Sequence, residues 1–201
     1  MAMGAAVGDF ELGMDELRAV ARYAAESAEQ VLTIFEAVHP EDTRPRAAID
    51  AAWAFANGAP RTRLQRVTAV DAHRAAASTT DEAAKHAARA AGDAAAAAYL
   101  HPLANSTQVG HILGAAAHAA RAAELSEGDD PDVGAVRIEQ AGQRATPVLI
   151  TVLRRYPPAA GGKSRAAQLM TALDTSLRTP GSVPDPQDED ATSADCRRSS
   201  D

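Results

Sequence analysis

Apolar residues recur along this chain at spacings of three and four, which is the pattern of a helix with one buried face. The first stripe predicts a helix over residues 15–36 that ends before Pro40. Its apolar positions are Leu17, Val20, Ala24, Val31, Leu32 and Phe35. A second helix is predicted to start at Asp42 or Thr43, either of which can cap it, and to end at Gly58. Its apolar face carries Ile49, Ala52, Trp53 and Ala56.

Five more helices follow from the same pattern and from helix-start signals. They cover about residues 62–77, 80–98, 106–125, 131–156 and 164–178. The third helix of the chain carries the apolar residues Leu64, Val67 and Val70. We expect Thr79 and Glu82 to form the capping box of the fourth. Pro147 predicts either a kink in the sixth helix or two short helices that meet at Thr146.

These helices and the absence of strand signals predict an all-α fold, a single compact bundle of six to eight Ala-rich helices. The bundle is expected to span residues 14–178, after a flexible N-terminus at 1–13. Residues 179–201 are rich in Pro, Ser and acidic side chains, which predicts a disordered tail because so little of it can be buried.

Alanine dominates the apolar share of 46%, while aromatic residues make up only 3%. Because Ala contributes little area, the core is expected to depend on close helix–helix approach rather than on bulky side chains. Gly92 lies in the middle of a predicted helix, which suggests that another backbone passes close to it. Gly110 and Gly114, four residues apart, predict a similar strip for close packing.

Charge excludes some functions. The net charge is −7, of which the tail contributes −4, so the remaining body is nearly balanced and offers no basic field for nucleic acid. The small negative charge of the body gives only weak support for a basic partner. The N-terminus lacks a signal-peptide pattern and no apolar run is long enough for a bilayer, so we expect a cytoplasmic protein without a membrane partner. The single cysteine, Cys196, excludes a disulfide framework.

The histidines are the clearest candidates for chemistry. His111 and His118 are seven apart on one predicted helix, and His73 and His86 lie on neighbouring helices, so the four could assemble a metal site with Asp93 or with Asp71. The spacing alone favours partly buried histidines that hydrogen-bond within the fold. No metal-protease, phosphate-loop or nucleophile motif occurs, so neither a cofactor nor a catalytic residue is expected.

Arg44 and Arg46 flank the predicted start of the second helix, where the helix dipole disfavours cations. An acidic partner such as Asp50 or a loop carboxylate is therefore expected to hold them, in preference to an external ligand. Trp53 is expected in the core or half-exposed, and only secondarily as an anchor at an interface.

Four segments resemble sequence elements of a known family. Residues 41–58 read EDTRPRAAIDAAWAFANG and resemble the element acidic-x-RPR-x-AIEAAR-x-W-x-x-G. In the same way, the segment VDAHRAAA of this chain resembles the family element AHAAAR. The segment AAKHAARAAGDAAAAAYLH resembles AARAAGHAAATAH, and HILGAAAHAARA resembles HALGAA-x-YA. These elements are those of the immunity-five-like group of bacterial immunity proteins, which is associated with polymorphic toxin systems. Asp93 stands where the pattern has His, and His118 where it has an aromatic residue.

The resemblance implies a small all-helical protein that binds and neutralises a protein toxin. The positions that match the motifs are Arg44, Pro45, Arg46, Trp53, His73, Arg89, Gly92, His101 and His111. Our first hypothesis is a non-enzymatic immunity protein that acts by occlusion, covering the active site of the toxin. The alternative is a ligand- or metal-binding helical domain that uses His73, His86, His111 and His118, and a metal-dependent hydrolase is the least favoured. The sequence leaves a homo-oligomer open.

Overall fold

The computed structural model describes residues 10–179, and every regular element within that range is helical. The described range contains nine α-helices and two short 3-10 helices, which confirms the all-α bundle. Their bounds are α1 (Met14–Glu29), α2 (Leu32–Val38), α3 (Arg44–Ala56), α4 (Arg63–Ser78), α5 (Glu82–Ala96), η1 (Ala97–Tyr99), η2 (Ser106–Gln108), α6 (Val109–Ser126), α7 (Pro131–Arg144), α8 (Pro147–Arg154) and α9 (Arg165–Arg178). Most of the predicted flexible N-terminus (1–13) and of the predicted tail (179–201) lies outside the described residues, which begin at residue 10 and end at residue 179.

The described part has one helix more than the predicted range of six to eight, because the first predicted helix is divided in two. Helix α1 ends at Glu29 and α2 begins at Leu32, with Val31 between them at a φ of −121°. Val31 and Leu32 are each only 2% exposed, so the break lets both side chains enter the core. Neither Gly nor Pro marks this break, which is why the local sequence did not predict it.

Most of the predicted helix starts are confirmed. Thr62, Asp130, Thr146 and Ser164 each accept a hydrogen bond from the first turn of the helix that follows. Helices α7 and α8 meet at Thr146, as one of the two alternatives for Pro147 predicted. The predicted Thr79 capping box is wrong, since Asp81 caps α5 by accepting a hydrogen bond from the Ala84 N–H at 2.7 Å.

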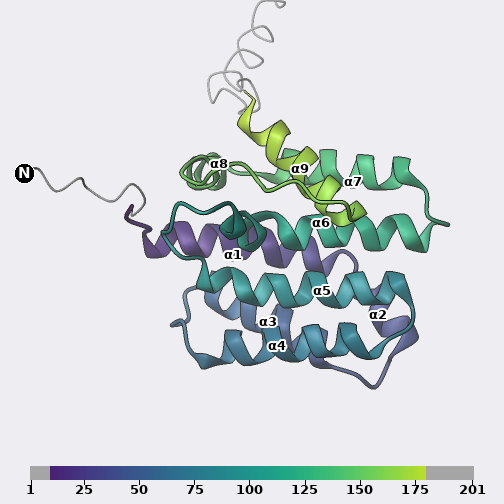
Figure 1. Ribbon diagram of the computed structural model, residues 1–201. Coiled ribbons are helices and arrows are strands. Elements are labelled where there is room, and N and C mark those ends of the chain that lie inside the picture. The colour runs from purple at the N-terminus through teal and green to yellow at the C-terminus, as the bar shows by residue number, and fades with distance from the viewer. Residues whose placement is uncertain (1–9, 180–201) are drawn as a thin grey trace, which may run out of the picture.

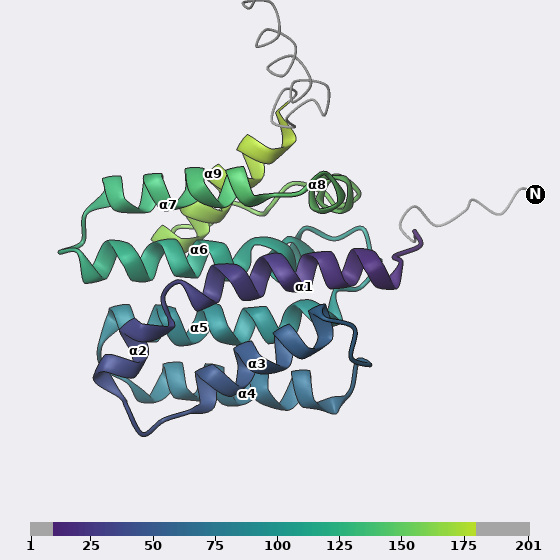
Figure 2. The same ribbon diagram turned by 180° about the vertical axis from the view of Figure 1, so that it is seen from behind.

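The helices form three layers (Figures 1 and 2). Helix α5 lies in the centre beside α1 and α6, and α3 and α4 cover one side of this central layer, with α2 at its end. Helices α7, α8 and α9 cover the opposite side. As a result α5 has neighbours on several sides, which explains why its sequence is rich in Ala on almost every face.

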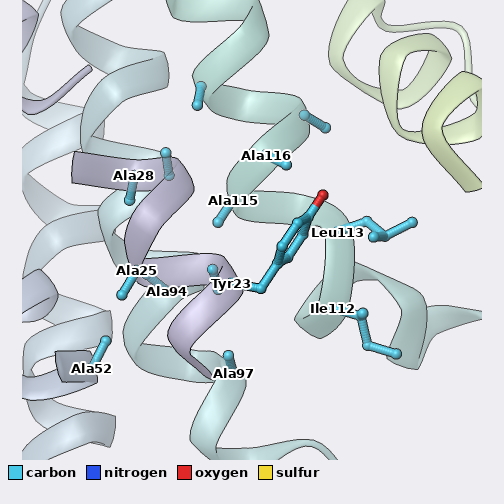
Figure 3. Packing of buried hydrophobic residues seen from close by; sticks show 14 of the residues in the cluster. Tyr23, Ala25, Ala28, Ala52, Ala94, Ala97, Ile112, Leu113, Ala115 and Ala116 are labelled. Carbon is cyan, nitrogen blue, oxygen red and sulfur yellow. The ribbon is translucent and has the colours of Figure 1, made fainter. Parts of the chain in front are cut away.

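The core is built mainly from alanines that let the helices approach closely, as the composition predicted. Figure 3 shows Tyr23 lying against α6 beside Leu113 and Ala116, with alanines of α1 and α5 close by. The Tyr23 hydroxyl donates a hydrogen bond to the Ala141 carbonyl oxygen at 3.1 Å, which ties α1 to α7. Larger side chains fill the remaining space, among them Phe35, Phe55, Ile112, Leu149 and Leu173.

Helix α4 does not bury the apolar residues that mark it in the sequence. Leu64, Val67 and Val70 are 52%, 40% and 44% exposed. The buried residues of this helix are instead Gln65, Thr68, Ala69, Ala72, Ala75 and Ala76. Small and hydrogen-bonded side chains therefore allow α4 to pack closely on α3 and α5, and its larger apolar side chains face outward.

None of the helices within residues 10–179 combines the length and the apolar character that crossing a bilayer requires.

Candidate functional site

Helices α4, α5 and α6 present polar side chains at helical spacing along their contacts with one another. His73 lies on α4, His86 and Asp93 are seven residues apart on α5, and His111 and His118 are seven apart on α6. A spacing of seven is about two helical turns, so the members of each pair share a face. These faces meet because α5 packs against both α4 and α6.

Four of these side chains form a continuous row, which we call the histidine row: His73, Asp93, His118 and His86. The Nε2 atom of His73 lies 3.5 Å from Oδ1 of Asp93, and the other carboxyl oxygen lies 3.8 Å from Nε2 of His118. The Nδ1 atoms of His118 and His86 are 2.8 Å apart, so one ring donates a hydrogen bond to the other. The row therefore links α4, α5 and α6 through polar contacts.

Two glycines make room for this row. A Cβ atom on Gly92 would lie 2.8 Å from the ring of His73, and one on Gly114 would lie 2.8 Å from Oδ2 of Asp93. The sequence had predicted that a backbone approaches Gly92, but a side chain occupies that space. Gly110 has nothing within 4 Å of its would-be Cβ, so the predicted packing strip of Gly110 and Gly114 is wrong.

Burial keeps the imidazoles of the row uncharged at neutral pH. It lowers the pKa of His86 to about 4 and that of His118 to about 3, and it also lowers the pKa of His73. The positive charge of Arg89 adds to this effect at all three histidines. Burial raises the pKa of Asp93 to about 7, so this carboxyl group carries a proton for part of the time at neutral pH.

A pocket of about 290 Å³ adjoins the row at His73. Its lining residues come from α4, the end of α5, η1, the loop after η1, and α6: Arg66, Ala69, Val70, His73, Ala96, Tyr99, His101 and His111. The guanidinium of Arg66 lies 4.8 Å from the centre of the Tyr99 ring, and the Tyr99 hydroxyl donates to the Thr62 carbonyl oxygen at 2.7 Å. Apolar walls with an aromatic ring, an arginine and imidazoles suit the recognition of a side chain or a small ligand.

Three of the motif positions meet at this pocket: His73, His101 and His111. Burial lowers the pKa of His111, which a neighbouring charge on His101 lowers further. His111 lines the pocket together with His73, whereas His86 and His118 contact each other in the row. Within residues 10–179, no group of three His, Cys, Asp or Glu side chains is arranged to hold a metal ion.

Of the other motif positions, Arg89 and Gly92 lie on α5, and the remainder lie on α3, where their contacts are internal. Arg44 pairs with Asp42, a loop carboxylate as predicted, at 2.8 Å and 2.5 Å. Arg46 pairs with Glu36 on α2, with Nε 2.7 Å from Oε1. Trp53 is half-buried and donates a hydrogen bond from Nε1 to Glu29 at 3.2 Å.

Sequence reasoning did not single out Arg66 and Tyr99. Arg66 is one of many arginines, and Tyr99 follows a run of alanines, so only the fold brings both to the pocket. The two departures from the motif pattern, Asp93 and His118, turn out to be neighbours in the row at 3.8 Å. Both substitutions therefore change the same cluster of side chains.

The fold and this site describe an all-helical protein with a pocket whose polar and apolar features suit recognition. The chain belongs to the Imm-5 like putative immunity protein family, which matches residues 11–146. Neither the curated proteins nor the solved structures include a significant match to it. The family match covers all residues of the histidine row and of the adjoining pocket.

Proposed function

We propose that this protein is an immunity protein that neutralises a protein toxin by binding it and occluding its active site. Membership of an immunity protein family supports a protein partner. The observation that favours one particular surface is the outward position of Leu64, Val67 and Val70 on α4, beside the pocket lined by His73, His101 and His111.

The apolar side chains of α4 can supply the centre of a protein interface. Leu64, Val67 and Val70 are three residues apart, so they lie close together along the outer side of the helix. A group of exposed apolar residues on one helix, rimmed by polar ones, is typical of a protein-binding surface. Tyr99 and Arg66, both at the neighbouring pocket, belong to the residue types that are enriched in interface hot spots.

The charge of this surface favours an acidic partner. Helix α4 carries Arg63, Arg66 and Arg74 against a single carboxylate, Asp71, which pairs with Arg74 at 3.0 Å. Arg89, a motif position on α5, is also exposed next to the histidine row. The toxin is therefore expected to present an apolar surface with acidic side chains around it, rather than the basic surface of a nuclease.

Binding by occlusion needs no chemistry from the immunity protein, and the site is in accord with this. The imidazoles of the row are engaged with each other and with Asp93, so none is aligned with a side-chain nucleophile. In this proposal His73, Arg89, His101 and His111 lie on the toxin-facing surface. The binding role predicted for Arg44, Arg46 and Trp53 stays a prediction.

The test is a co-expression experiment with candidate toxin domains, each produced in the same cells as this protein. Wild-type protein should restore growth, and the substitution Val67→Glu should abolish protection, because it places a charge in an apolar interface and opposes an acidic partner. We expect affinity to fall at least about thirtyfold in a binding assay with the purified toxin, the size of a hot-spot loss.

The matched control is Val136→Glu on α7, since Val136 is also exposed, at 51%, but lies away from α4. It should protect as well as the wild type. Full protection by Val67→Glu would contradict the proposed surface. Loss or modification of the toxin when the immunity protein is substoichiometric would contradict occlusion, because an occluding protein inhibits one molecule at a time and leaves its partner intact.

A further inference from the structure

A second pocket, of about 330 Å³, lies on the other side of the molecule from α4. Its walls come from α1, the end of α3 and the junction of α7 with α8. The lining residues are Asp15, Arg18, Ala19, Arg22, Tyr23, Glu26, Ala56, Arg144 and Thr146. Three arginines therefore converge here, two from successive turns of α1 and one from the last turn of α7.

The charges of these arginines are poorly matched by the protein. Within residues 10–179, neither Arg22 nor Arg144 forms an ion pair with a carboxylate. Arg22 donates to the Ala56 carbonyl oxygen at 3.2 Å and to the Asn57 side chain at 2.8 Å. The hydrogen bond of Arg144 is to the Ser27 hydroxyl at 3.2 Å. Arg18 has a carboxylate partner, Asp15, but at 3.3 Å and with the carboxylate 97% exposed, so water weakens the pair.

Two donors of this cluster also lack an acceptor. The Nε atoms of Arg18 and Arg144 are buried and have no hydrogen-bond partner among the described residues. A buried donor of a charged group that forms no hydrogen bond is costly, so such donors are rare in native folds. Arg144 thus has neither a carboxylate partner nor an acceptor for its Nε, and Arg18 has only the exposed carboxylate of Asp15 and no acceptor for its Nε.

We propose that this pocket binds an oxyanion, a carboxylate or a phosphate group, which brings negative charge to the three arginines. Guanidinium groups bind both kinds of oxyanion through paired hydrogen bonds. Helix α8 begins at the pocket with Thr146 as its cap, and the start of a helix also favours negative charge. Asp15 and Glu26 leave the lining with a formal charge of +1, which suits a compact oxyanion better than a polyanion.

This site is separate from the proposed toxin-binding surface, because none of its lining residues comes from α4, α5 or α6. Binding at this pocket can be followed by tryptophan fluorescence. The guanidinium of Arg22 lies 5.4 Å from the centre of the ring of Trp53, the single tryptophan of the chain. An oxyanion that binds the guanidinium of Arg22 changes the surroundings of the Trp53 indole. Binding is therefore expected to alter Trp53 fluorescence.

The experiment titrates the full chain with sodium phosphate and, separately, with sodium acetate, each at constant ionic strength with chloride. We expect a saturable change in Trp53 fluorescence with at least one of them, and the arm that responds identifies phosphate or carboxylate as the ligand chemistry. The same anion should raise the melting temperature above its value in chloride alone, because it binds only the folded state.

The substitutions Arg144→Gln and Arg18→Gln should each weaken binding about tenfold or more, and circular dichroism confirms that they fold. Arg63→Gln on α4 is the matched control, since Arg63 is an exposed arginine away from this pocket, and it should bind as the wild type does. The proposal is overturned if neither anion changes the fluorescence or the melting temperature beyond chloride. It is equally overturned if both glutamine variants respond like the wild type.

Discussion

Several glycines of this protein leave space that the side chain of one neighbouring residue occupies. Gly92 accommodates His73, and Gly114 accommodates Asp93. The tightest case is Gly134 on α7, where a Cβ atom would lie 1.9 Å from Oε1 of Glu124. Glu124 is fully buried, so its carboxylate has little freedom to move aside. At such positions the side chain of the neighbour, rather than backbone conformation, requires glycine.

Replacing Gly134 by alanine should therefore destabilise the fold by about 2–3 kcal/mol, the cost of overpacking a rigid site. The opposite is expected of Gly110→Ala, because the space around Gly110 is open and alanine favours a helix by up to about 1 kcal/mol. Urea unfolding of both variants measures the difference. Equal stability of the two would show that Glu124 moves more freely than its burial implies.

At the scale of helices, polar contacts supplement a core that has few large side chains. The histidine row joins α4 to α5 and α5 to α6. Because the imidazoles of the half-buried row are uncharged at neutral pH, the stability of the fold depends on pH. Burial lowers the pKa of His86 to about 4 and of His118 to about 3, whereas an unfolded histidine titrates near 6.5. Below pH 6.5 the unfolded chain therefore takes up two protons here that the folded chain does not.

Asp93 has the opposite effect. Burial raises its pKa to about 7, so the folded chain holds a proton that the unfolded chain loses above its usual pKa near 3.8. His86, His118 and Asp93 together give a net difference of one proton, and the lowered pKa of His73 acts in the same direction as that of the other two histidines. Stability is therefore expected to fall as the pH is lowered from 6.5 to 4.5, by about 1.4 kcal/mol per pH unit or more. The carboxylates of Glu16 and Asp42 contribute little in this window, because their arginine partners lower their pKa.

Urea unfolding at pH 7.5, 6.5, 5.5 and 4.5 measures this slope. Asp93→Asn removes the opposing proton and should make the slope steeper. His118→Asn should make it shallower, since it removes one of the histidines whose pKa is lowered in the folded chain. His101→Asn is the control, because His101 is exposed and outside the row. An unchanged slope in His118→Asn would refute this account of the row.

The whole molecule extends beyond the part that matches its family. The match ends at residue 146, where α8 begins, yet α9 packs against both α6 and α7. Leu169, Leu173 and Leu177 of α9 are buried. Arg165, at the start of α9, binds the buried carboxylate of Glu124 with Nε 2.9 Å from Oε1. Helix α9 therefore completes the core of this protein in addition to covering it.

A chain that ends at residue 146 should consequently be much less stable than the full chain, because it exposes apolar surface on α6 and α7 and leaves Glu124 without Arg165. Deleting only residues 180–201 should leave the melting temperature unchanged, since that composition can bury little surface. Thermal unfolding of the two truncated chains tests both expectations. A stable chain of residues 1–146 would show that α8 and α9 are dispensable for the core.

The sequence by itself determined the all-helical class, most helix starts and the family. These features rest on local information: caps such as Thr62 and Ser164 bond to backbone groups two or three residues away, and alanine favours helices wherever it occurs. The partner of Arg44 was predictable for the same reason, because Asp42 lies two residues before it. Short-range signals of this kind do not depend on the rest of the fold.

Only the tertiary structure decided which side of each helix is buried and which distant residues meet. Val67 faces outward because α4 packs through its small residues, and α1 ends at Glu29 because Val31 enters the core. Arg18 and Arg144 are 126 positions apart in the sequence, yet they line one pocket. Ala-rich helices offer several nearly equivalent faces, so the choice among them depends on the packing of the whole bundle rather than on local pattern.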